Sequence, residues 1–110
     1  MEGQMIKGYI DGILLSILLE GDSYGYAIAR VVFERTNQTF EIKEGTLYPA
    51  LRRLEAEGFI QGYWAEEEQG PRRRYYMITD KGRDELHKVR QQWANNARVI
   101  QTFLRGALSE

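Results

Sequence analysis

The segment from Gly45 to Thr79 constrains the fold most, because it predicts a short helix followed directly by a β-hairpin. Pro49 cannot donate to the carbonyl four residues back and therefore belongs in a first turn. The helix is thus expected to begin near Gly45 or Thr46, with Thr46 as its N-cap. Gly58 suits the left-handed position that ends a helix.

The hairpin is predicted from residues 59–66 and 72–79, which are rich in aromatic and apolar side chains and alternate in part with a period of two. Gly70 and Pro71 favour a turn between them. Thr79 and Asp80 then predict the start of another helix, whose dipole the carboxylate of Asp80 complements.

Two helices are predicted before this segment. Residues 9–20 carry apolar side chains at the i, i+3, i+4 and i+7 spacing, and Gly21 ends that helix. Residues 24–36 form the second helix, with Ser23 as its expected N-cap.

Phe40 and Ile42 follow a polar break and are expected to be extended and to pair as a minor strand. The order is then helix, helix, minor strand, helix, hairpin, helix. Three helices with a hairpin directly after the third are typical of a winged helix-turn-helix, whose third helix enters the DNA major groove. The fold class is therefore expected to be mostly α, with a small β wing and a long C-terminal helix.

The last helix is predicted to run from about residue 81 to 108, which is about 40 Å at 1.5 Å per residue. Its apolar residues recur at alternating steps of three and four, and the chain has nothing left to cover them beyond the first two turns. We therefore expect residues 1–79 to form a DNA-binding domain and residues 80–110 a dimerisation helix. Packing of the helix along its own domain is the alternative. The expected interface residues are Leu86, Val89, Trp93, Ala97, Ile100 and Leu104.

Enzyme classes are poorly supported by the composition. The chain has no cysteine and one histidine, His87, so thiol catalysis, disulfides and cysteine-based zinc sites are excluded. No glycine motif for phosphate is present. We expect no enzymatic activity, metal or cofactor. No run of eighteen apolar residues and no signal peptide is apparent, which favours a cytoplasmic protein without a membrane segment.

The arginines cluster although the formal net charge is −1. Arg52 and Arg53 are adjacent on the third helix, where ion pairs with Glu55 and Glu57 are the alternative to DNA contact.

A second cluster, Arg72 to Arg74, follows the Gly-Pro turn of the hairpin. These side chains alternate between the two faces of a strand and cannot share one role. A solvated charge run is the usual explanation, yet a wing that follows the DNA backbone needs such residues. Arg74 is expected to pair with the neighbouring strand, and the acidic residues 66–68 oppose the cluster.

Three segments resemble the PadR family of bacterial transcriptional regulators: GDSYGYAIA at residues 21–29, GTLYPALRRLEAEGFI at 45–60 and GPRRRYYMIT at 70–79. The resemblance covers essentially the whole chain. It implies a dimeric winged-helix protein, usually a repressor, that binds a palindromic operator and releases it when a small aromatic molecule binds. The C-terminal region resembles the subfamily with a single dimerising helix.

The resemblance and the architecture together predict which residues meet double-stranded DNA. They lie at the starts of the second and third helices, later on the third helix, and on the wing. The expected contacts are Tyr24, Lys43, Thr46, Tyr48, Arg52, Arg53, Gly70, Arg72 and Arg73.

An effector site is expected around Trp93, because two indoles facing each other across a dimer can enclose a flat ligand. Arg90 and Ala97 stand where multidrug-binding relatives place an aromatic and an acidic residue. An anionic or neutral aromatic is therefore favoured over a cationic one, and plain interface packing is the alternative. Two other functions stay open, a winged-helix protein-interaction module and a protein that sequesters a small molecule.

Overall fold

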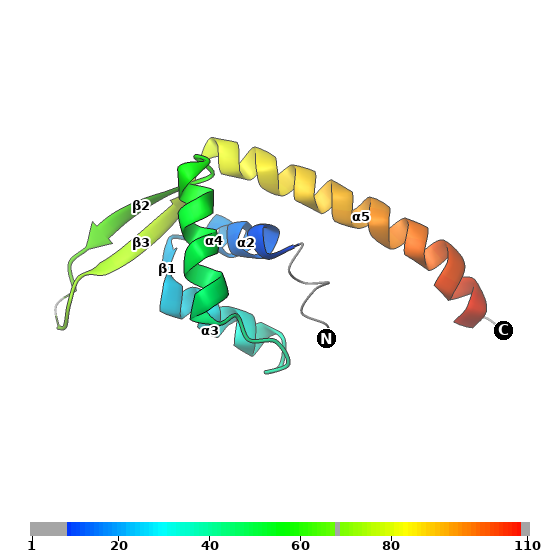
Figure 1. The fold of residues 1–110 in the computed structure, drawn as a ribbon, viewed down its shortest axis with the longest axis horizontal. Coiled ribbons are helices and arrows are strands. Elements are labelled where there is room, and N and C mark those ends of the chain that lie inside the picture. The colour runs from blue at the N-terminus through cyan, green and yellow to red at the C-terminus, as the bar shows by residue number, and fades with distance from the viewer. Residues whose placement is uncertain (1–8, 68, 109–110) are drawn as a thin grey trace.

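The computed structural model describes residues 9–67 and 69–108. Its elements are α2 (Ile10–Glu20), β1 (Ser23–Tyr24), α3 (Gly25–Arg35), α4 (Glu44–Ala56), β2 (Ile60–Ala65), β3 (Arg73–Ile78) and α5 (Asp80–Leu108). In Figure 1, the helices α2, α3 and α4 form a small body, the β2–β3 hairpin extends from one side, and α5 runs past the other. The predicted fold class, mostly helical with a small sheet and a long C-terminal helix, is confirmed.

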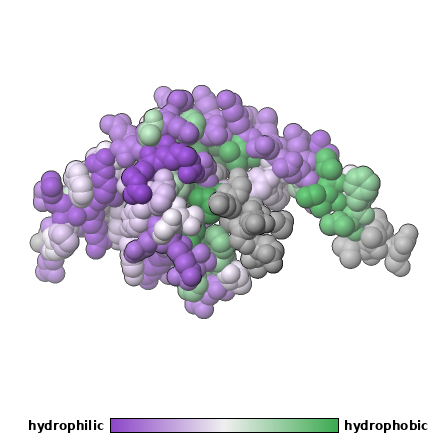
Figure 2. Space-filling view, viewed as in Figure 1, coloured by the Kyte–Doolittle hydropathy of each residue, from purple (hydrophilic) through white to green (hydrophobic). Residues whose placement is uncertain are grey.

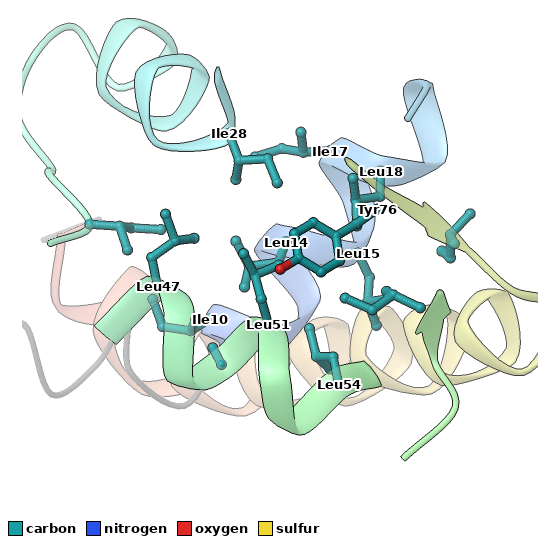
Figure 3. Packing of buried hydrophobic residues seen from close by; sticks show 14 of the residues in the cluster. Ile10, Leu14, Leu15, Ile17, Leu18, Ile28, Leu47, Leu51, Leu54 and Tyr76 are labelled. Atoms are coloured by element: carbon teal, nitrogen blue, oxygen red, sulfur yellow. The ribbon is translucent and has the colours of Figure 1, made fainter. Parts of the chain in front are cut away.

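The core is built around α2. Leu14, Leu15 and Leu18 of this helix are almost fully buried. Figure 3 shows them surrounded by side chains from other elements, including Leu51 of α4 and Tyr76 of β3. Because α2 contributes apolar side chains on more than one side, α4 and the hairpin are positioned against the same helix.

The sheet has the strand order β1-β3-β2 and is antiparallel throughout. The minor strand is β1, and its position shows that two predictions are wrong. Ser23 is not an N-cap but pairs with Tyr76, and α3 starts after Tyr24 without a side-chain cap. Phe40 and Ile42 form no strand; they pack on or in the core from a loop, and Ser23 and Tyr24 pair with β3 as the minor strand instead.

Helix α4 begins earlier than predicted. Lys43 is its N-cap residue, and the Lys43 carbonyl accepts hydrogen bonds from the amides of Thr46 and Leu47, each at 2.9 Å. Thr46 is therefore a helical residue and not the cap, and Pro49 lies beyond the first turn. One proline at this position removes a single helical hydrogen bond, to the carbonyl of Gly45, which is exposed to solvent.

The C-terminal end of α4 agrees with the prediction. Gly58 has a φ of +81°. Its amide donates to the carbonyl of Glu55, and the amide of Phe59 donates to the carbonyl of Leu54, both at 3.0 Å. These two bonds form a Schellman motif, which requires the left-handed glycine.

Thr79 joins the end of α4 to the start of α5. Its hydroxyl donates to the carbonyl of Gly58 at 2.6 Å and accepts from the amide of Gly82 at 3.1 Å. Gly82 is so close to this junction that a Cβ there would lie 2.0 Å from the carbonyl oxygen of Phe59. The predicted start of the last helix at Thr79–Asp80 is confirmed, and we call this junction the Thr79 corner.

The first turns of α5 pack along α2. Leu86 is only 3% exposed, and a Cβ on Gly12 would meet Cγ1 of Val89 at 2.6 Å. The remainder of α5 extends past the body, which gives the molecule a longest dimension of 59 Å (Figure 1). Across residues 9–67 and 69–108, no helix combines the length and the apolar character needed to cross a membrane.

Candidate nucleic-acid interface

Helix α4 buries one side and presents the other to solvent. Leu47, Leu51 and Leu54 are in the core. Tyr48 and Arg52 lie one helical turn apart on the outer side, and the other predicted contacts on α4, together with Lys43 before it, are also exposed. The side chains expected to reach DNA are therefore available at the surface.

A hollow of about 250 Å³ connects three parts of this surface. It lies between the start of α3, the outer side of α4 and strand β3. Tyr48 contacts Gly25 closely, since a Cβ on Gly25 would be 2.5 Å from the Tyr48 hydroxyl oxygen. The residues lining the hollow are Tyr24, Gly25, Tyr26, Tyr48, Arg73 and Arg74. Three of the predicted DNA contacts, Tyr24, Tyr48 and Arg73, are thus brought together from three separate segments.

The inner base of the wing is a cluster of tyrosines. The ring of Tyr75 lies 5.1 Å from that of Tyr24 and 5.9 Å from that of Tyr63. The Tyr63 hydroxyl donates to Asp22 at 2.7 Å, and this bond raises the pKa of Tyr63. Burial, followed by the charge of Glu67, raises the pKa of Tyr75. These phenols stay neutral and hold the hairpin against β1.

The wing arginines have different surroundings. The Arg73 guanidinium lies 4.5 Å from the centre of the Tyr24 ring and 3.9 Å from a carboxylate oxygen of Glu67. Arg74 forms a 2.9 Å ion pair with Glu55 of α4, rather than with the neighbouring strand as predicted. Arg72 is exposed and, within the described chain, meets no carboxylate.

The alternative ion pairs within α4 are not formed. Glu55 turns to the wing, where it binds Arg74 and accepts from the amide of Gly62. Arg53 is paired with Asp11 of α2 and not with Glu57. Arg52 has no ion pair among the residues that the structure describes.

The acidic residues near the wing temper its charge in part. Glu67 is engaged by Arg73 and accepts a hydrogen bond from the Tyr75 hydroxyl at 3.4 Å. Glu66 is exposed, and Glu68 lies outside the described residues. Gly70, at the turn, is exposed with a φ of +95°, a conformation that favours glycine.

A second hollow, of about 290 Å³, lies between α2 and α5. Arg90 and Trp93 line it, as the effector prediction requires, whereas Ala97 does not. Sequence reasoning did not assign the other lining residues to an effector site, because the apolar ones look like ordinary core or interface residues and the rest carry no sequence signal. They are Tyr9, Gly12, Ile13, Ser16, Leu86 and Val89.

The predicted interface residues on α5 fall into two groups, one buried within the chain and one exposed. Leu86 is buried in its own chain and has little surface left for a partner. Figure 2 shows a hydrophobic patch on the C-terminal half of the helix. Val99 and Phe103 belong to this patch although sequence reasoning missed them, and their i, i+4 spacing was the available signal. The exposed apolar side chains of α5 are Trp93, Val99, Ile100, Phe103 and Leu104.

Within the described ranges, no three histidine or acidic side chains are grouped so that they could hold a metal ion.

Comparison with known proteins gives consistent similarities. Residues 14–88 match the family model described as the transcriptional regulator PadR-like family. The chain is 38% identical over 106 residues to the uncharacterized protein X of Lysinibacillus sphaericus, covering 96% of this chain and 97% of that protein. It is 32% identical over 74 residues to the negative transcriptional regulator PadR of Bacillus subtilis, covering 67% of this chain and 41% of that protein.

Solved structures are similar over nearly the whole chain. A transcriptional regulator from Clostridium thermocellum has a TM-score of 0.88 at 42% identity, covering 94% of this chain and 97% of the other. A PadR family transcription regulator from Clostridium difficile has a TM-score of 0.78 at 44% identity, covering 88% of this chain and 99% of the other.

Proposed function

Because this chain belongs to the transcriptional regulator PadR-like family, we propose that it binds a palindromic DNA operator as a homodimer and represses transcription. The observation that carries the proposal is the hollow shared by Tyr24, Tyr48 and Arg73. It brings the start of α3, the outer side of α4 and the wing onto one surface. In winged helix-turn-helix proteins these are the parts that meet DNA.

The homodimer is supported by the exposed apolar side chains of α5, which continue past the body of the chain. A second copy covering them would place two α4 helices for successive major grooves, about 34 Å apart. The division into residues 1–79 and 80–110 stays a prediction. The repressor role draws support from the name of the B. subtilis relative, a negative transcriptional regulator.

Release by an effector is supported by the hollow between α2 and α5. The Trp93 indole offers a flat apolar surface there, and Arg90 favours an anionic or neutral aromatic over a cation. A molecule that binds better to a dimer with altered helix spacing would lower the affinity for the operator, as linkage requires.

Selection of bound duplexes from genomic fragments tests the DNA-binding proposal. We expect enrichment of an inverted repeat whose half-sites are about one helical turn apart. The logarithm of the affinity should then fall linearly with the logarithm of the salt concentration, and each neutralised phosphate should add about 0.9 to the steepness of the slope. Arg72→Ala combined with Arg73→Ala should weaken binding strongly.

A protein-interaction module without operator binding predicts the opposite. It would enrich no duplex, and the arginine variants would bind DNA as poorly as the unmodified chain. An affinity for the selected duplex that stays constant between low and moderate salt would also contradict phosphate contact.

A further inference from the structure

Trp64 is a large aromatic residue on the exposed part of the wing. It lies in β2 directly opposite Arg74 of β3, and 56% of its surface is exposed. The guanidinium of Arg72 is 5.1 Å from the centre of the indole, and that of Arg74 is 5.5 Å from it. Neither the predicted DNA contacts nor the proposed effector site includes this tryptophan.

The sheet register fixes the direction in which this group faces. Ile60 pairs with Ile78, and Trp64 with Arg74, at even steps along both strands. Side chains two residues apart on a strand share one face. Trp64 and Arg74 therefore continue the face that is buried in the core at the base of the hairpin, and Arg72, just before β3, joins them through its contact with the indole. The Arg74–Glu55 ion pair places this face beside α4.

The two arginines differ in whether their positive charge is already neutralised by a carboxylate of the chain. Glu55 compensates Arg74, whereas Arg72 has no carboxylate partner in the part of the chain that the structure describes. A guanidinium stacked on an aromatic face still directs its N–H groups outward and can donate to a phosphate. The exposed side of the indole offers apolar contact, which the sugars and bases of nucleic acid also provide.

We propose that Trp64 and Arg72 act together as a DNA-contacting pair on the wing, an inference that rests on the proposed function. Arg72 donates to a backbone phosphate, and the indole packs against the adjacent deoxyribose. The unpaired positive charge beside an exposed aromatic surface favours DNA over an apolar protein partner. Trp64 thus supplies contact area, and Arg72 supplies the salt-dependent part of the binding.

Fluorescence can isolate this residue because the chain has two tryptophans, Trp64 and Trp93. The Trp93→Phe variant leaves Trp64 as the only indole. It is titrated with the duplex recovered by the genomic selection, which carries a remote end label so that anisotropy reports binding independently. We expect the Trp64 emission to change and to saturate at the same duplex concentration as the anisotropy.

Affinity measurements complete the test. Trp64→Ala should weaken binding roughly 5-fold, because the apolar area that the indole buries against the deoxyribose is lost. Trp64→Phe should restore part of the affinity. Arg72→Gln should reduce the salt slope by about 1, whereas Trp64→Phe should leave it unchanged. Met77→Ala is the matched control, because Met77 is exposed on the opposite face of β3.

The inference is overturned if the duplex binds while Trp64 emission stays constant and Trp64→Ala binds like the unmodified chain. That result would leave the proposed function intact and assign the indole to another partner. If the unmodified chain binds no duplex, the proposed function and this inference are both wrong.

Discussion

Asp11 of α2 and Arg53 of α4 form an ion pair between residues that are 42 positions apart in the sequence. Gly12 and Ile13, which follow Asp11, line the hollow between α2 and α5. The helix expected to enter the major groove is therefore bound by a side-chain contact to a wall of the proposed effector site.

The Asp11–Arg53 pair is expected to make a small contribution to stability. Its side chains are 33% and 50% exposed, and exposed ion pairs contribute about 0.2–1 kcal/mol. Urea unfolding of Asp11→Asn, Arg53→Gln and the double variant gives the coupling free energy directly. We expect it to lie in this range and to shrink as salt is added. Strict additivity of the two substitutions would show that the pair contributes nothing.

Arg52 and Arg53 should differ in DNA binding although they are adjacent. Arg52 is exposed and has no ion pair in the described chain, whereas Arg53 is held by Asp11. Arg52→Gln is therefore expected to lower the affinity for the selected duplex more than Arg53→Gln does, and to reduce the salt slope by about 1. Arg35→Gln is the control, because Arg35 is paired with Glu20. Equal losses for Arg52 and Arg53 would contradict the prediction.

Gly82→Ala should destabilise the chain severely. The new Cβ would lie 2.0 Å from the carbonyl oxygen of Phe59, and backbone must move to accommodate it. A cost of about 1–3 kcal/mol or more is expected for such overpacking. Gly45→Ala is the matched helical control, because nothing lies within 4 Å of its Cβ. For Gly45→Ala, thermal unfolding should show a free energy of unfolding higher by about 0.5–1 kcal/mol, because alanine has the higher helix propensity.

Ile100→Glu combined with Leu104→Glu should give a folded monomer. These side chains are 50% and 60% exposed in the single chain, so the core does not depend on them. Charges in a buried dimer interface are strongly unfavourable. Sedimentation should show half the mass of the unmodified protein, with unchanged circular dichroism per residue. Gln91→Glu with Asn95→Glu adds the same charge on the other side of α5 and should leave the mass unchanged.

Alkaline pH should destabilise the fold in part through Tyr76. Burial, followed by the negative charge of Glu55, raises the pKa of this phenol. The folded state then holds the proton more tightly than the unfolded state does. Stability is therefore fully present below the ordinary tyrosine pKa of about 10 and is lost as pH rises through the folded-state pKa.

The Tyr76→Phe variant isolates this effect. Near neutral pH it should change the free energy of unfolding by about 1 kcal/mol, through loss of the hydroxyl. Between about pH 8 and pH 11 its stability should fall less than that of the unmodified chain. Part of the loss should persist, because the pKa values of Tyr63 and Tyr75 are also raised. An identical decline for both proteins would assign the alkaline loss to other groups.

Local signals explain which elements could be predicted from the sequence. Gly58 ended α4 as expected, because a Schellman motif depends on a few adjacent residues. Strand β1 could not be foreseen, because it is two residues long and exists only by pairing with β3 about fifty residues later. The prediction of Thr46 as a cap is wrong because it rests on a proline in the first turn, and Pro49 lies beyond that turn.

The candidate site divides in the same way. The exposure of Tyr48 and Arg52 followed from helical periodicity, so their place on the outer side of α4 was predictable. The pairing of Glu55 with Arg74, and of Arg53 with Asp11, depends on how distant elements pack. Trp64 gave no sequence signal as a binding residue, although the cross-strand register places it opposite Arg74.

The Thr79 corner fixes the start of α5 to the end of α4 and is therefore the pivot about which α5 would tilt. The helix has 29 residues, and its far end is about 43 Å from the pivot. A tilt of about 5° there displaces that end by roughly 4 Å. Small changes in the angle between α2 and α5 would therefore produce large displacements at the C-terminal end of α5. If a partner held that end in place, the same angular changes would instead reorient α4.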